Sequence, residues 1–224
     1  MSPANAWRLC AIIGLPALVV SRMIGQSAGL ADCGHPGGLE PVLAFEFVRN
    51  AADVGQVLLG GGCRAGQAHG LFLDNLLFVP LYTLFVISAA WAAGLTRGAD
   101  RRVAIAAATA ILIAAASDLI ENATLAAILD GGDDFDRLFW AVRIKFGLIA
   151  VGEMLVGMLL LRHTLLLRFA GYMVIVAGAS AFITLVLGVP IAMMKPIALG
   201  LILLFCVAIA ASIRPSLVAP GKPA

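Results

Sequence analysis

Residues 103–129 read VAIAAATAILIAAASDLIENATLAAIL, and their only ionisable side chains are Asp118 and Glu121. The stretch exceeds the length of about 20 apolar residues that crosses a hydrocarbon core of about 30 Å as a helix. A helix is expected because lipid-exposed backbone must satisfy its own hydrogen bonds, and the stretch lacks the alternation of barrel strands. It therefore predicts a membrane-spanning helix that carries two carboxyl groups.

The composition of the whole chain agrees with this prediction. Of its 224 residues, 62% are hydrophobic and 12% are charged, and the mean hydropathy is +1.02. A soluble domain of this length needs more charged residues to cover its surface. The formal net charge is +2, without the basic clusters that nucleic-acid binding requires. We expect an integral membrane protein with no nucleic-acid partner.

Five other apolar stretches have a similar length. They are Leu9–Leu30, Leu71–Leu95, Leu138–Leu161, Leu165–Val189 and Pro196–Ile213. Most connections between them are short, and no Ser-rich linker divides the chain. The sequence predicts an all-α fold, a six-transmembrane-helix bundle that forms a single membrane domain over 1–224.

Basic residues gather in alternate connections, which face the cytoplasm according to the positive-inside rule. These residues are Arg8, Arg97, Arg101, Arg102, Arg162, Arg168, Arg214 and Lys222. We expect a bacterial inner (plasma) membrane protein with both termini in the cytoplasm. The acidic loop DGGDDFD at 130–136 then faces outward as a solvated loop. A cleaved signal sequence is the alternative for the first apolar stretch.

Residues 31–70 are predicted to form an outer, periplasmic cap segment. Apolar residues recur there at helical spacing, at Leu43, Phe47, Ala51, Val54 and Leu58. This pattern predicts one interfacial amphipathic helix. Glu46 lies on another face of that helix, either solvated or turned to a pocket. Cys33 and Cys63 flank it, and a disulfide between them remains open at this point.

Polar residues inside the spans are concentrated. An ionisable group in a membrane is costly unless it is paired or hydrated, so each one is a functional-site hypothesis. Asp118, Glu121 and Asn122 have the spacing i, i+3, i+4, which places them on one stripe of a helix. Asp118 lies about 22 Å from the cytoplasmic end of its span. Arg143 and Lys145 of the next span reach a similar depth.

The second span adds Asp74 and Asn75 near its outer end, with Tyr82 two helical turns below Asn75 on a similar face. Glu153 lies near the middle of the fourth span. These residues predict a polar pocket that opens toward the outer leaflet. Carboxyl groups outnumber the cations of the fourth span, so they must share protons, bind a cation or face water. Such a carboxyl group is suited to proton donation.

Structural roles are the alternative at each position. Asp118 or Glu121 paired with a cation can simply fix the helix register. Arg143 can extend to the headgroups, and Tyr82 can serve only packing.

The chain resembles a group of uncharacterised bacterial polytopic inner-membrane proteins. The motifs that carry the resemblance are Phe-Glu at 45–46, Asp-x-x-x-Phe-x-Pro-x-Tyr at 74–82 and Asp-x-x-Glu-Asn at 118–122. It covers roughly residues 40–150 and implies no particular activity. It implies one constellation, made of Glu46, Asp74, Tyr82, Asp118, Glu121 and Asn122.

The leading hypothesis is a pocket that binds a lipid or other amphiphile, with acid–base processing of it as a further expectation. The proposed catalytic residues are Asp118, Glu121 and Asp74. The proposed ligand-binding residues are Glu46, Asn75, Tyr82, Asn122, Arg143 and Lys145. We expect no metal or cofactor, and membrane lipids as partners. A proton-coupled transporter and a structural or assembly subunit are the alternatives, so enzymatic activity stays open.

Overall fold

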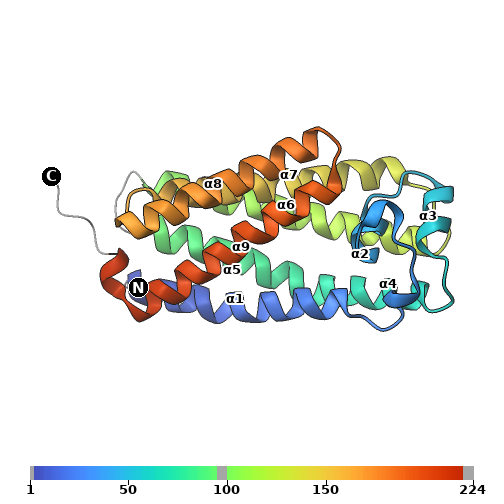
Figure 1. The fold of residues 1–224 in the computed structure, drawn as a ribbon, viewed down its shortest axis with the longest axis horizontal. Helices are drawn as coiled ribbons and strands as arrows, with labels where there is room; N and C mark the ends of the chain where they lie inside the picture. The colour runs from blue at the N-terminus through green and yellow to red at the C-terminus, as the bar shows by residue number, and fades with distance from the viewer. Residues whose placement is uncertain (1–2, 95–99, 219–224) are drawn as a thin grey trace. The chain divides into compact units, whose positions relative to one another are not determined.

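The structure is a computed structural model that describes residues 3–94 and 100–218, and all its regular elements there are helical (Figure 1). The long helical elements are α1 (Pro3–Gly25), α4 (Cys63–Leu73), α5 (Val79–Gly94), α6 (Asp100–Leu129), α7 (Phe135–Leu160), α8 (Leu165–Val186) and α9 (Pro190–Ile213). The short ones are η1 (Leu30–Asp32), η2 (Pro36–Gly38), α2 (Pro41–Glu46), α3 (Ala51–Val57), η3 (Asp74–Phe78) and η4 (Pro215–Val218). The all-α prediction is confirmed for these residues.

Within the described ranges, five helical stretches are long and apolar enough to cross a membrane. They are Ala4–Gly25, Cys63–Gly94, Asp100–Leu129, Leu165–Val186 and Pro190–Ile213. Their outward side chains suit lipid, since Leu165, Phe169 and Val186 of α8 are 82%, 65% and 71% exposed. These features are those of a multi-pass membrane protein. Arg97 and Lys222, which contribute to the predicted orientation, lie outside the described residues.

The chain divides into two compact units. The first comprises Met1–Pro16, Leu81–Ala114 and Phe146–Ala224, and the second comprises Ala17–Pro80 and Ala115–Lys145. In the first unit α8 packs along α9. There α7 and α8 also approach closely, because a Cβ atom on Gly171 would lie 2.7 Å from the carbonyl oxygen of Gly157. Small residues of this kind permit close helix packing in membranes.

The predicted cap contains two short helices instead of one. Asn50 begins α3, and its side chain accepts a hydrogen bond from the Asp53 N–H at 3.0 Å. Asp53 Oδ2 in turn accepts one from the Arg49 N–H at 2.7 Å. This reciprocal cap fixes a helix start at Asn50 and breaks the chain after α2. The prediction of a single amphipathic helix through Phe47 is therefore wrong.

A disulfide between Cys33 and Cys63 joins the segment after η1 to the first residue of α4, with 4.9 Å between the two Cα atoms. The side-chain amide of Gln67 adds a second connection, since Nε2 donates to the Pro41 carbonyl at 2.9 Å. The cap is thus attached to the N-terminal half of α4 by one covalent bond and one buried hydrogen bond.

A π-helical turn, η3, separates α4 from α5. The Val79 N–H bonds to the Asp74 carbonyl, five residues back. The next residue is Pro80, which has no N–H and whose ring conflicts with a regular helical turn before it. The extra residue in this turn changes the register, so the prediction of Tyr82 two regular turns below Asn75 is wrong. Asn75 is exposed, whereas Tyr82 is 3% exposed.

Removing the disulfide by Cys33→Ser with Cys63→Ser is expected to lower the free energy of unfolding by about 3.5 kcal/mol, because the bond closes a loop of about 30 residues. Thermal unfolding of the detergent-solubilised protein measures the loss. Cys206→Ser is the control, because this exposed cysteine of α9 is free. Alkylation of all four cysteines in unreduced, denatured wild-type protein would contradict the prediction.

Candidate functional site

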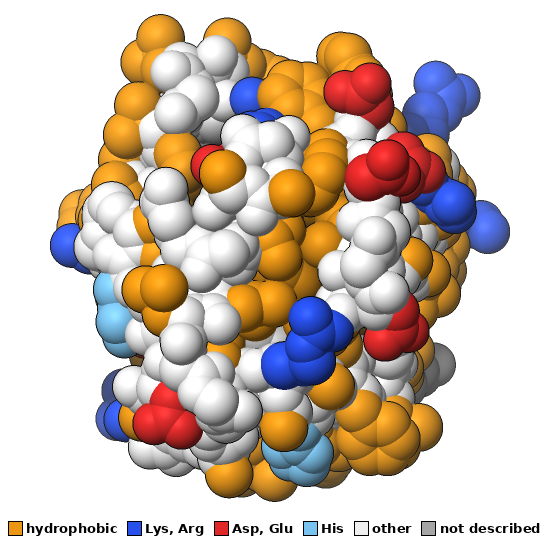
Figure 2. All heavy atoms as spheres, turned by 90° about the vertical axis from the view of Figure 1, so that its right-hand side faces the viewer, with side chains coloured by type: hydrophobic (Ala, Val, Ile, Leu, Met, Phe, Trp, Pro, Cys, Tyr) orange, Lys and Arg blue, Asp and Glu red, His pale blue; other side chains and the backbone are white. Residues whose placement is uncertain are grey.

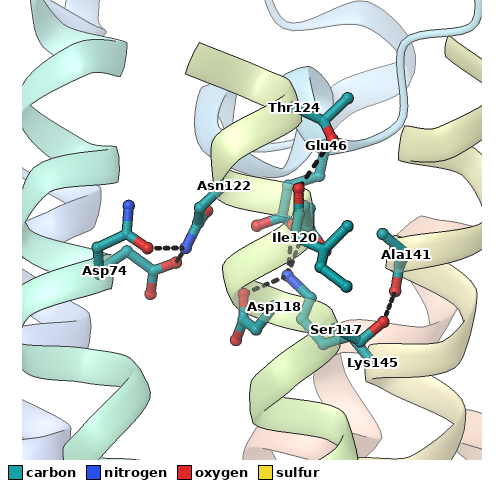
Figure 3. Close-up of polar contacts among 11 residues, drawn as sticks. Glu46, Asp74, Ser117, Asp118, Ile120, Asn122, Thr124, Ala141 and Lys145 are labelled. Carbon is teal, nitrogen blue, oxygen red and sulfur yellow. Dashed lines mark hydrogen bonds and ion pairs between the residues drawn. The ribbon is translucent and has the colours of Figure 1, made fainter. Parts of the chain in front are cut away.

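The ammonium group of Lys145 is surrounded by three carboxyl groups of the second unit (Figure 3). Its Nζ lies 2.6 Å from Glu121 Oε1, 3.2 Å from Glu46 Oε2 and 3.4 Å from Asp118 Oδ1. Glu46 is the last residue of α2, Asp118 and Glu121 belong to α6, and Lys145 belongs to α7. These four residues, the lysine cluster, are each at most 9% exposed.

A second polar group lies beside the lysine cluster, also in the second unit. Asn122 of α6 donates through Nδ2 to Asp74 Oδ2 at 2.6 Å and to Asn75 Oδ1 at 3.3 Å. Figure 3 shows Asp74 pointing from its helix toward Asn122. Asp74 and Asn75 are the first two residues of the π-helical turn. Such turns are often found at functional sites.

A small cavity connects the two polar groups. Its volume is about 10 Å³, which is room for about one water molecule. Its lining comprises Val42, Phe45, Glu46, Gln67, Gly70, Leu71, Asp74, Asn122 and Leu125. Glu46 of the lysine cluster and Asp74 of the second group therefore border the same space. A single water molecule there can relay a proton between their carboxyl groups.

The charges of the lysine cluster do not balance. One ammonium group faces three carboxyl groups, and the fully ionised cluster would keep an excess of negative charge in a buried place. An unbalanced buried charge is costly, so protons must be retained or shared within the cluster. Burial raises the pKa of Glu46, with Asp118 acting in the same direction and Lys145 opposing it. The arrangement can therefore hold, donate and accept protons.

A larger groove, with a volume of about 610 Å³, lies between α4 and α6 in the second unit. It is lined by Gly61, Arg64, Ala65, Ala68, Leu71, Phe72, Asn75, Ala126, Leu129 and Asp130. The volume is in the range of small-molecule sites. Leu71 borders both the groove and the small cavity. Asn75 lies in the wall of the groove and, through Asn122, is hydrogen-bonded into the polar group that contains Asp74.

Within the second unit, the structure brings together seven of the nine predicted site residues. Arg143 makes no ion pair in the described part of the chain, and its guanidinium carbon lies 3.5 Å from the ring centroid of Phe139. Tyr82 belongs to the first unit, where it is buried. The other seven are Glu46, Asp74, Asn75, Asp118, Glu121, Asn122 and Lys145.

Gln67 was not predicted as a site residue, although it is 1% exposed and borders the small cavity. The sequence contains a pattern from which the burial of Gln67 could have been predicted. Cys63, Gly66, Gln67, Gly70 and Leu71 have the spacing of one helical face, and all five are buried in α4. Placing the cap boundary at residue 70 hid this pattern.

Replacing Lys145 by Met is expected to lower the free energy of unfolding by about 3 to 5 kcal/mol, because three buried carboxyl groups lose their cation. Combining it with Glu121→Gln should recover part of the loss, since one surplus carboxyl group is removed. Thermal unfolding of the two single variants and the double variant measures this coupling. Arg137→Met, at an exposed position of α7, is the matched control. Equal stability of Lys145→Met and wild type would show that the ion pairs do not form.

Comparison with known proteins finds no matching family model, no matching curated protein and no matching solved structure. The resemblance suggested by the motifs at 45–46, 74–82 and 118–122 therefore stays a prediction. The chemistry of the site must be inferred from the lysine cluster, the small cavity and the groove.

Proposed function

We propose that this is a six-span protein of the bacterial inner membrane that binds a lipid or other amphiphile in the groove between α4 and α6. The carboxyl groups of the adjoining polar site exchange protons with the bound molecule. The observation that carries the proposal is the position of Asn75. It lies in the groove wall and accepts a hydrogen bond from the side-chain amide of Asn122, which also donates to Asp74.

The sixth span of this proposal is α7. Its 26 residues reach about 39 Å as a helix, which is enough to cross the hydrocarbon core. It has five charged residues, and two of them are withdrawn from lipid. Lys145 is 4% exposed, and Glu153 is 0% exposed. A span with its charges turned inward is compatible with a bilayer.

The disulfide and the surface of the cap support an outward orientation for the end of the second unit at which α2 and α3 lie. Disulfides persist in oxidising compartments such as the periplasm, and Cys33–Cys63 lies in the cap. Figure 2 faces the end at which α2 and α3 lie, and shows charged side chains of both signs around hydrophobic ones. A mixed surface of this kind is suited to a membrane–water interface. With alternating topology, both termini then lie in the cytoplasm.

The groove suits a molecule with a polar end and an apolar chain. Arg64 and Asp130 supply charges in its lining, whereas Leu71, Phe72 and Leu129 supply apolar wall. Phe72 is 59% exposed, so its ring is available for contact with an apolar chain in the groove. A hydrocarbon chain would cover it and leave the polar end of the ligand near Asn75.

The chemistry proposed for the site is proton transfer without a covalent enzyme intermediate. Among the buried carboxyl groups of the site, Asp74 is the one connected to the groove wall, because it shares Asn122 with Asn75. Glu121 and Asp118 hold the proton reserve around Lys145. A proton given up at Asp74 can be replaced from Glu46 through the small cavity that both residues border.

Filling the groove by Ala68→Trp is expected to weaken binding of pyrene-labelled phosphatidylethanolamine by about tenfold or more, because the indole occupies the space of the ligand. Fluorescence titration of the protein in detergent measures the affinity. Ala116→Trp adds the same bulk at an exposed position of α6 outside the groove lining and should change the affinity less than about twofold. Equal binding by wild type and Ala68→Trp would exclude the groove as the site.

The acid–base step is tested with Asp118→Asn and Glu121→Gln, which should retain phosphatidylethanolamine binding. If this proton exchange serves a bond-breaking reaction of the lipid, mass spectrometry of the membrane lipids from cells that produce wild type or variant should show one lipid species changed only by the wild type. Identical lipid profiles would limit the protein to binding.

A proton-coupled transporter is the second candidate, and the observation that favours it is Glu153 in the first unit. Both carboxyl oxygens are buried without a hydrogen-bond partner within residues 3–94 and 100–218. A Cβ atom on Gly200 would lie 2.6 Å from this carboxyl group, so it packs directly on α9. Buried carboxyl groups among apolar spans are typical of proton relays.

Glu153→Gln is therefore expected to abolish proton uptake if the protein is a transporter, because the amide cannot carry a proton. Proteoliposomes containing a pH-sensitive dye measure the flux under an imposed membrane potential. Glu40→Gln, at an exposed position, is the control and should retain the flux. Equal flux in wild-type and protein-free liposomes would exclude this candidate.

A further inference from the structure

Two side chains of opposite charge line the groove between α4 and α6 in the second unit. Arg64 is the second residue of α4, and Asp130 directly follows the last residue of α6. Both side chains are exposed. No ion pair joins them, since the ion pairs within residues 3–94 and 100–218 have only Lys145 and Arg162 as their cations. One cationic and one anionic group are therefore available to a molecule in the groove.

Helix geometry places both charges at the same end of the groove. At the other end Asn75 is hydrogen-bonded to Asn122, so these two residues lie at one level. In the second unit α4 and α6 run in opposite directions (Figure 1). Arg64 precedes Asn75 by eleven residues, and Asp130 follows Asn122 by eight. At about 1.5 Å per residue, Arg64 lies about 16 Å and Asp130 about 12 Å from the asparagine level, toward the cap.

Asn75 offers a hydrogen-bond donor at the inner end of the groove. Its Oδ1 accepts from Asn122 Nδ2 at 3.3 Å, so the side-chain oxygen is engaged. Its Nδ2 makes no hydrogen bond within the described residues, and the side chain is exposed in the groove lining. An amide group of this kind can donate to a carbonyl oxygen.

This order of groups along the groove corresponds to that of a glycerophospholipid. Such a lipid has a charged headgroup at the membrane surface, ester carbonyl groups below it and hydrocarbon chains below those. With the headgroup between Arg64 and Asp130, the ester groups extend toward Asn75. The exposed ring of Phe72, one turn from Asn75, is then available to the upper part of a chain.

The pair of charges also distinguishes between headgroups. A guanidinium group binds phosphate through paired N–H donors, and a carboxylate accepts the N–H groups of a primary ammonium. A trimethylammonium group has no N–H and is recognised by aromatic cages, whereas Phe72 alone is aromatic among the described residues of the lining. A headgroup with phosphate but no cation would be repelled by Asp130.

We propose that Arg64 and Asp130 select a zwitterionic glycerophospholipid with a primary amine, of which phosphatidylethanolamine is the simplest. Arg64 binds its phosphate, Asp130 binds its ammonium group, and Asn75 donates to an ester carbonyl. This inference rests on the proposed function, because it names the class of ligand for the same groove.

The test uses the full-length protein in an uncharged detergent and three lipids with the same pyrene-labelled chain, which are phosphatidylethanolamine, phosphatidylcholine and phosphatidylglycerol. Fluorescence titration should show phosphatidylethanolamine binding at least about tenfold more tightly than the other two, because only its headgroup satisfies both charges.

Two variants separate the two charges. Asp130→Asn should reduce the preference for phosphatidylethanolamine over phosphatidylglycerol to less than about threefold, because the repulsion of the anionic headgroup is removed. Arg64→Gln should weaken the binding of both lipids by about tenfold, because both contain the phosphate. Asp133→Asn and Arg137→Gln, at exposed positions outside the groove lining, are the matched controls and should change each affinity less than about twofold.

Four results would overturn the proposal. Equal affinity of the wild type for the three lipids, with Ala68→Trp still weakening all of them, would reject the headgroup assignment and leave the groove as a lipid site. An unchanged preference in Asp130→Asn, or unchanged affinities in Arg64→Gln, would exclude that residue. Chain-free glycerophosphoethanolamine binding as tightly as phosphatidylethanolamine would assign the site to a soluble headgroup. No saturable binding of any of the three lipids would reject the proposed function together with this inference.

Discussion

The arrangement of the second unit depends on the ion pairs of Lys145. A single ammonium group connects α2, α6 and α7 through Glu46, Asp118 and Glu121. In a low-dielectric environment a charge without its partners costs far more than an unfilled apolar contact. The three elements are therefore held in a register that alternative packings of apolar helices could not specify. Specificity of this kind is one attested use of buried ionic groups.

The π-helical turn has a comparable role in the second polar group. Pro80 disturbs the regular helix, and the wider turn before it contains Asp74 and Asn75. This turn presents both side chains to Asn122 of α6. The turn thus places Asn75 in the lining of the groove and Asp74 in the lining of the small cavity. In a regular α-helix, the side chains of Asp74 and Asn75 would point in directions 100° apart about the helix axis.

The sequence predicts the lysine cluster well, because the stripe of α6 and the depth of Lys145 depend only on helix geometry. It does not distinguish Arg143 from Lys145, since two cations two residues apart point to opposite faces, and only packing shows which face is buried. The break between α2 and α3 was missed because it depends on local hydrogen bonds of Asn50 that override an apolar pattern. The position of Tyr82 relative to Asn75 was predicted wrongly, because the spacing of residues in the sequence does not reveal a π-helical turn between them.

The charges of the second unit are distributed unevenly between its ion pairs and its arginines. Surplus carboxyl groups surround Lys145, whereas Arg49 and Arg143 have no carboxylate partner within residues 3–94 and 100–218. Arg49 follows Glu46 by three residues, and Arg143 precedes Lys145 by two. Modest changes of side chain could pair these groups, so the observed arrangement is not the one that charge pairing alone favours. Carboxyl groups that outnumber the ammonium group beside them can retain and exchange protons, which is the property that the proposed acid–base role requires.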